Sequence, residues 1–232
     1  MADRHDAAFL AGLQLADAFL PTGAYTLSQG LESMVQLGWL ATVADLEAAL
    51  GTYLSEQVAP ADGVAVASAH RASADEDLDE VMAIDRYLTA LKLAREPREG
   101  SRRIGRNLLL AVSKTGDDRL LAAYVDAVTS ELTPGNHAVA LGVAGRAQGL
   151  SARESGLVFL YASAVGMLGA ALRLMRLDHL SAQAILVRLR PHLIQLAESS
   201  ESRPWQSMRS FGPQLELAAM AHERARVRLF TS

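Results

Sequence analysis

The sequence has no cysteine among its 232 residues, and only 5% of its side chains are aromatic. The lack of cysteine excludes disulfide bonds, thiolate zinc sites, iron–sulfur clusters and cysteine nucleophiles. There is no large excess of either charge, because 26 acidic side chains stand against 22 basic ones, a net charge of −4. Proteins devoted to nucleic acid usually carry a strong basic excess, so nucleic acid is not an expected partner.

Half of the residues are hydrophobic, and one apolar run approaches the length of a membrane span. The run from Ser155 to Leu172 contains no charged residue, and its length is at the lower bound for crossing a bilayer. Small residues interrupt the run, and Glu154 and Arg173 close it without an aromatic belt, so we expect a buried helix of a soluble protein. The first six residues are too charged for an export signal. We therefore expect a cytoplasmic protein without a membrane partner.

Helical periodicity extends over almost the whole chain, and the alternating β-branched and aromatic runs typical of strands do not occur. Thr42 with Asp45, and Ser151 with Glu154, have the spacing of capping boxes at helix starts. The pattern predicts helices over residues 7–19, 42–57, 60–72, 75–94, 97–113, 117–132 or 118–132, 137–148, 151–172, 182–197 and 214–230. In the first of these, one helical face carries Phe9, Leu10, Leu13, Ala16 and Phe19.

Two prolines and one change of composition set the expected boundaries. Pro60 suits the first turn of a new helix, and Pro191 is expected to kink or split its helix. Residues 198–212 are polar. The expected fold is all-α, a single-domain helical bundle over residues 1–197, followed by a polar linker at 198–212 and a C-terminal interaction helix and tail at 213–232.

Signatures of enzymes are missing. The sequence has no GxxxxGK[ST] loop, no GxSxG elbow and no HExxH motif. Its six histidines are scattered singly, without a ligand partner at helical spacing. The sequence therefore predicts no catalytic residue and no bound metal, although a site assembled only in three dimensions stays open.

The arginines allow two interpretations. Arg98, Arg102 and Arg106 recur four residues apart and form either a solvated helix face or a docking stripe for an acidic protein surface. Near the C-terminus, Arg224, Arg226 and Arg228 precede Leu229-Phe230. An exposed aromatic residue beside arginines has the composition of an interface hot spot.

Small residues also recur every fourth position in the long apolar run, at Ala162, Gly166 and Ala170. This spacing lets another backbone approach closely. The approaching helix belongs either to the core of the same molecule or to a second copy across a dimer axis.

The segment at residues 20–32, LPTGAYTLSQGLE, is the most specific motif. It resembles the N-terminal signature of the urease accessory protein UreF family, approximately P-x-G-x-[FY]-x-x-S-x-G-L-E, although Leu27 replaces a frequent aromatic residue. Further matches follow in order along the chain, at Ser101–Arg106, Gly135–His137, Gly149–Ser151, Arg173-Leu174, Gln183, Pro213, His222-Glu223 and Arg228–Phe230. Met175–His179 departs from the pattern, because the family usually has a turn with proline and glycine there.

The resemblance implies an all-α homodimer without catalysis of its own. Members of the family bridge UreD, also called UreH, and the GTPase UreG in the complex that inserts nickel into apo-urease. Nickel and GTP are then handled by the complex and are not bound directly by this chain. By motif, Tyr25, Glu32 and Arg228 are the expected contacts to UreG.

The resemblance further implies that the C-terminal segment binds UreD, with His222, Glu223, Leu229 and Phe230 as its residues. A second hypothesis, independent of the resemblance, is an all-α enzyme or small-ligand regulator with a pocket between helices. An enzyme needs ionisable groups that converge in an apolar cavity. An adaptor instead displays its unusual residues on the surface and at the chain ends.

Overall fold

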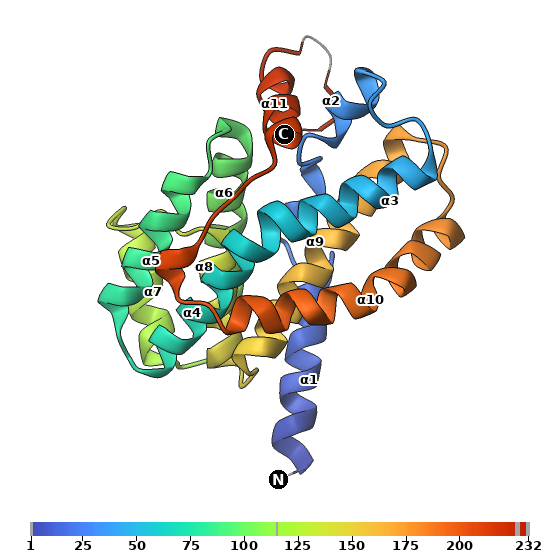
Figure 1. The fold of residues 1–232 in the computed structure, drawn as a ribbon. Coiled ribbons are helices and arrows are strands. Elements are labelled where there is room, and N and C mark those ends of the chain that lie inside the picture. The colour runs from blue at the N-terminus through green and yellow to red at the C-terminus, as the bar shows by residue number, and fades with distance from the viewer. Residues whose placement is uncertain (1, 115, 226–227, 231–232) are drawn as a thin grey trace.

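The computed structural model describes residues 2–114, 116–225 and 228–230, and these residues form helices and connecting turns without a β-strand. The central helix is α9 (Ala152–Leu174), and α1 (Ala2–Ala16), α4 (Val64–Ala74), α8 (His137–Ala147) and α10 (His179–Glu201) all pack against it (Figure 1). The prediction of an all-α single domain is thereby confirmed.

Helix α9 contains the apolar run, and among the described residues it alone is long and apolar enough to cross a membrane. It lies inside the bundle and buries Phe159, Leu160 and Met167, as a core helix does. The predicted capping box at its start is present, because Ser151 Oγ accepts from the backbone N–H of Glu154 and the Glu154 carboxylate accepts in return. The second predicted box, at Thr42 and Asp45, is present as well.

One long helical rod crosses the bundle (Figure 1). It consists of α3 (Val43–Thr52), a π-helical segment η2 (Tyr53–Gly63) and α4, without a break between them. The prediction that Pro60 starts a new helix is wrong, since Pro60 lies inside η2. A widened helical turn tolerates a residue that has no backbone N–H to donate.

Carbonyl oxygens of η2 accept hydrogen bonds from the end of α10 and from the segment that follows it. Ser200 Oγ donates to the carbonyl of Ala59 (2.9 Å), the N–H of Arg209 to that of Pro60 (3.1 Å), and the N–H of Phe211 to that of Glu56 (2.9 Å). The polar segment after α10, which includes the short helix η3 (Trp205–Ser207), is therefore bonded to the body of the protein.

Helix α10 continues through Pro191, so of the two outcomes expected at this proline the split does not occur. The helix ends later than predicted, at Glu201, so residues 198–201 of the expected linker are helical. The buried side chains of Leu189 and Leu193 flank the proline and pack into the core, which offsets the hydrogen bond that proline cannot make.

Helices α5 (Leu78–Leu91), α6 (Arg95–Val112) and α7 (Arg119–Thr129) complete the other side of the bundle. The buried carboxylate of Asp85 in α5 joins α5 and α7 to the turn at 133–136. Its donors are the hydroxyls of Tyr124 and Thr133, the N–H groups of Gly135 and Asn136, and the side-chain amide of Asn136. A carboxylate with this many donors is stabilised without an opposite charge.

Close helix packing depends on one glycine in particular. A Cβ atom at Gly142 of α8 would overlap the carbonyl oxygen of Val66 in α4. Glycine at this position lets the two backbones approach, which fixes the pairing of α4 and α8.

The N-terminal signature and the C-terminus form the remaining part of the fold. Residues 20–32 contain the short helix η1 (Ala24–Thr26) and the start of α2 (Leu31–Gln36), and α11 (Pro213–His222) packs against α2 and α6. The last helix was predicted to continue to residue 230. It ends at His222 instead, and Arg228–Phe230 return to α2 and α6.

The first helix faces differently from a core helix. It ends at Ala16, and its predicted apolar face is largely outside, since Phe9, Leu10 and Leu13 are exposed while Leu15 is buried. This leaves an apolar stripe of α1 on the surface of the single chain.

Candidate functional site

One face of α6 supports both the N-terminal signature and the C-terminus. The face consists of positions that follow one another at helical spacings of four, three and four residues, namely Glu96, Gly100, Arg103 and Asn107. Three of them contact residues 22–27: Asn107 Nδ2 donates to the carbonyl of Thr22 (3.0 Å), Arg103 Nη2 donates to Thr26 Oγ1 (2.9 Å), and Leu27 packs where Gly100 has no side chain. The fourth position, Glu96, contacts the C-terminus.

Tyr25 lies on the surface beside this face. It belongs to η1, which follows Gly23 in the left-handed backbone region, and its side chain is 61% exposed. No core packing therefore depends on the ring.

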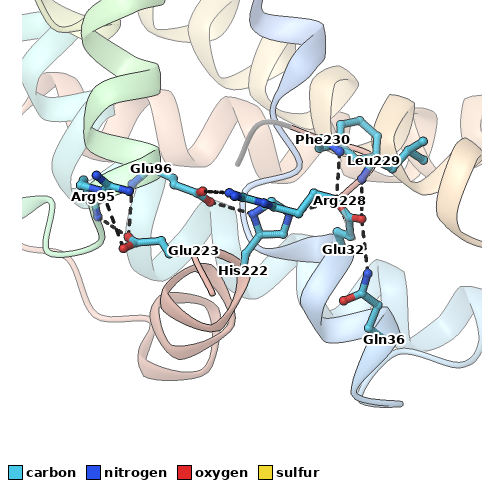
Figure 2. Close-up of polar contacts among 9 residues, drawn as sticks. All are labelled: Glu32, Gln36, Arg95, Glu96, His222, Glu223, Arg228, Leu229 and Phe230. Atoms are coloured by element: carbon cyan, nitrogen blue, oxygen red, sulfur yellow. Dashed lines mark hydrogen bonds and ion pairs between the residues drawn. The ribbon is translucent and has the colours of Figure 1, made fainter. Parts of the chain in front are cut away.

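The C-terminus is joined to α2 and α6 by a cluster of four ionisable groups, shown in Figure 2, which we call the tail clamp: Glu32, Glu96, His222 and Arg228. The two ring nitrogens of His222 each bond one carboxylate, with Nδ1 at 2.7 Å from Glu96 Oε2 and Nε2 at 3.0 Å from Glu32 Oε2. Arg228 Nη1 donates to the second oxygen of Glu96 at 2.7 Å. The tail clamp thus joins three helices to the returning tail.

The carboxylate of Glu32 is only 2% exposed and is fully occupied. Its two oxygens accept from the backbone N–H groups of Leu229 (2.8 Å) and Phe230 (3.1 Å), and Gln36 Nε2 adds a longer contact (3.3 Å). Burial alone would raise the pKa of Glu32, but the donors from the tail and from His222 outweigh it and lower that pKa. Glu32 is therefore held as an anion.

The imidazole of His222 is completely buried between the two carboxylates. Each ring nitrogen faces one carboxylate oxygen, so the ring has a hydrogen-bond partner on both sides. The guanidinium of Arg228 adds a positive charge beside Glu96. Hydrogen bonds and a nearby opposite charge are what make buried carboxylates tolerable.

Glu223 stabilises the start of α6. Its Oε1 accepts from the backbone N–H of Arg95 (2.9 Å), with a longer contact to that of Glu96 (3.4 Å). No side chain at the N-cap position, Ala94, serves these groups, and a carboxylate there also complements the helix dipole. Glu223 therefore attaches the end of α11 to α6.

The two last described residues point in different directions. Leu229 is 62% exposed, whereas Phe230 is 5% exposed, with the guanidinium of Arg173 at 5.7 Å from its ring centroid. The expectation of an exposed aromatic residue at 230 is thus wrong, because the ring fills a space against α9. Arg226 lies outside the described residues.

The arginine stripe is not a freely solvated face. Arg98, Arg102 and Arg106 are all half-buried, and Arg98 Nη1 donates to the carbonyls of Lys92 (2.9 Å) and Leu93 (3.1 Å) at the end of α5. The Nε atoms of Arg102 and Arg106 are buried without a partner among the described residues.

Sequence reasoning did not identify Glu96 as a site residue. Its partners His222 and Arg228 lie 126 and 132 residues further along the chain, so no local spacing connects them. The sequence does show a carboxylate at the start of an arginine-rich helix. A carboxylate is favoured at that position by the helix dipole alone, so it did not indicate a site.

A hollow lies between α11 and η2, and its lining includes Tyr53, Asp62, Lys92 and Glu216. Two of the charged groups in this lining, Lys92 and Asp62, bond each other, with Lys92 Nζ at 2.8 and 2.9 Å from the two carboxylate oxygens. Within the described ranges, no group of three or more histidine, aspartate or glutamate side chains is placed to hold a metal ion.

Comparison with known proteins gives one consistent result. The sequence profile of the UreF family matches residues 40–190. The chain is 34% identical over 224 residues to the urease accessory protein UreF of Trichodesmium erythraeum, which covers 96% of both chains. It is 33% identical over 220 residues to the proteins of that name from Yersinia pseudotuberculosis and Yersinia pestis, covering 95% of this chain and 96% of theirs.

Proposed function

This chain belongs to the UreF family of urease accessory proteins, and from that premise we propose that it is a non-catalytic scaffold that bridges UreD (UreH) and the GTPase UreG. The proposed setting is the cytoplasmic complex that inserts nickel into apo-urease. Nickel and GTP belong to the complex and are not bound directly by this chain, and nucleic acid and membranes are not among its partners.

The observation that carries the proposal is that the N-terminal signature and the C-terminal tail meet on α6. Residues 22–27 lie along one end of a single face of α6, and Arg228 pairs with Glu96 at the other end of that face. Arg103 and Glu96 are seven residues apart, about 10 Å along a helix axis. Tyr25 is next to Thr26, which bonds Arg103, and Arg228 bonds Glu96. One partner protein can therefore contact Tyr25 and Arg228 together.

Within this site, we assign the contacts to UreG by exposure. The ring of Tyr25 is exposed, and the side chain of Arg228 is 41% exposed although it pairs with Glu96. Tyrosine and arginine are also the residue types enriched among interface hot spots. These two residues are the proposed anchors for UreG, and the stripe of Arg98, Arg102 and Arg106 is a proposed secondary contact for acidic groups.

UreD is the proposed partner of the C-terminal segment. Leu229 is exposed on the tail, and Leu217 and Met220 are exposed on α11, which together offer an apolar surface. The segment that carries this surface is attached to the body of the protein by His222, Glu223 and Phe230. These three residues therefore support UreD binding indirectly.

A homodimer is also part of the proposal. Residues of α1 and α9, among them Phe9, Leu13 and Tyr161, line an apolar groove on the surface. Val158 lines the same groove, and the face of α9 continues from it in steps of four through Ala162 to Gly166, where nothing packs within 4 Å of a virtual Cβ atom. A second copy covering this face would bury apolar surface in a two-fold contact.

The testing experiment compares Tyr25→Ala and Arg228→Ala with wild type in the complex with UreD. Loss of an interface anchor commonly costs about 2 kcal/mol, so UreG should bind roughly thirtyfold more weakly to each variant. Arg190→Ala removes an exposed arginine of α10 and is the matched control, with unchanged UreG binding. Normal UreG binding by both site variants, or GTP hydrolysis by the purified chain alone, would overturn the proposal.

A further inference from the structure

We propose that Glu96 and Glu32 are positioning residues for Arg228, and that the tail clamp presents this arginine to the GTPase in one fixed orientation. The inference rests on the proposed function, since it explains how the proposed anchor Arg228 is held. It also separates Glu32, which the family signature groups with the contacts, from the residues that touch the partner.

The first step concerns the guanidinium of Arg228. One of its terminal nitrogens donates to Glu96 Oε1 at 2.7 Å, and Glu96 is 8% exposed in its side chain whereas Arg228 is 41% exposed. The carboxylate therefore lies beneath the arginine and the open side of the guanidinium faces outward. An arginine has further donors left for a carboxylate or phosphate after one such bond.

The second step concerns the backbone that follows Arg228. The consecutive N–H groups of Leu229 and Phe230 both point at the carboxylate of Glu32, at 2.8 and 3.1 Å. Two bonds from neighbouring peptide groups to one buried anion restrict the backbone directly after the arginine. Phe230 then fills a buried site, so the chain is fixed on the C-terminal side as well.

The third step concerns His222, which fixes the two carboxylates relative to each other. Its ring lies between them and bonds one on each side, as Figure 2 shows. Behind it, α2 and α11 are in close backbone contact, because a Cβ atom at Gly30 would lie 3.0 Å from the carbonyl oxygen of Leu215. The two anchors of the tail are therefore attached to one rigid unit.

The consequence is a lower entropic cost of binding. Immobilising a long side chain at an interface costs about 0.5–1.5 kcal/mol, which corresponds to roughly two- to tenfold in affinity. Because the tail clamp already restricts Arg228 in the folded protein, this entropy is lost during folding and not on binding. Glu32 itself cannot reach a partner, because its carboxylate is buried and both oxygens are occupied.

The test is a double-mutant cycle on the affinity of UreG for the complex with UreD. Glu96→Gln keeps the shape of the side chain and removes its charge. It should weaken UreG binding roughly two- to tenfold in the wild-type background and leave it unchanged in the Arg228→Ala background. Glu32→Gln is the second variant and should give the same pattern, with faster hydrogen exchange at the amides of Leu229 and Phe230.

The outcomes separate the two levels of the argument. Equal weakening in both backgrounds would mean that Glu96 acts on the fold or on another contact, and unchanged binding in both would leave it without any role; either result overturns the inference. Normal UreG binding by Arg228→Ala would instead remove the proposed anchor itself. Glu47→Gln, which breaks an exposed pair with Arg188 on α3 and α10, is the matched control and should bind UreG normally.

Discussion

Nε2 of His222 lies 3.0 Å from Oε2 of Glu32, although 190 residues separate the two along the chain. This contact joins the N-terminal signature to the last helix, and the opposite ring nitrogen extends it to Glu96 in the middle of the sequence. Three distant segments thus meet at one buried imidazole.

Replacing His222 by alanine should destabilise the fold strongly. The change leaves the buried carboxylates of Glu32 and Glu96 without their shared donor. Removing one member of a buried charged pair typically costs about 3–5 kcal/mol. Urea unfolding should show this loss for His222→Ala, whereas His179→Ala, at an exposed histidine, should change the free energy of unfolding by less than about 1 kcal/mol.

Lowering the pH should destabilise the fold through the protonation of His137. Burial, together with the nearby charge of Lys92, lowers the pKa of His137 from 6.5 to about 4 in the folded protein. Between these values the unfolded chain binds a proton that the folded protein does not, so stability is present above the unfolded pKa and is lost as the pH falls.

For the shift at His137, the expected loss is about 2 kcal/mol between pH 7 and pH 5. The free energy of unfolding measured at both pH values gives this difference for wild type. His137→Leu cannot titrate, so its loss over the same interval should be smaller by that amount. An equal loss in both proteins would assign the pH dependence to other groups.

Gly105→Ala should be among the most damaging single changes in α6. A Cβ atom there would overlap the carbonyl oxygen of Gly135, a backbone atom of the turn that the Asp85 carboxylate holds. We expect a loss of roughly 3 kcal/mol or more, since the overlap is relieved only by moving a helix.

The matched change for Gly105→Ala is Gly51→Ala in α3, where nothing lies within 4 Å of the added atom. Alanine in an open helical position should stabilise the protein by about 0.5–1 kcal/mol. Thermal unfolding of both variants should therefore shift in opposite directions. Similar shifts would show that α6 and the turn are not in close contact.

Gly166→Leu should test the proposed dimer face on α9. Nothing packs on Gly166 within the single chain, so leucine should leave the thermal stability of the monomer nearly unchanged. If a second copy approaches there, the longer side chain separates the two backbones. Light scattering should then give the mass of one chain, 24.8 kDa, where wild type gives about twice that mass. Gly51→Leu should remain dimeric, and a dimeric Gly166→Leu would place the contact elsewhere.

Local patterns were sufficient for much of the secondary structure. The capping boxes at Thr42 and Ser151 were predicted from partners three residues further along the chain and are present. Helix ends were less predictable where tertiary packing outweighs local preference. Pro60 and Pro191 both lie inside continuous helices, because buried neighbours and bonds from a distant segment offset the missing N–H.

The residues of the candidate site also differ in whether local sequence predicts their environment. Tyr25 follows a Pro-x-Gly turn, and its exposure follows from that local geometry. Phe230 and the partners of Glu32 do not follow from local sequence, because a short polar tail has equal reason to be solvated. Their burial depends on a hydrogen-bonded anion supplied by α2.

The sequence by itself determined the helical class, the helix starts with their own caps and the family to which the chain belongs, since each depends on residues within a few positions of one another or on their order. The tertiary structure alone decided that Glu32, Glu96, His222 and Arg228 form one cluster. Charges more than 100 residues apart interact only after the helices that carry them have packed, and burial then makes each unpaired group too costly to leave without a partner.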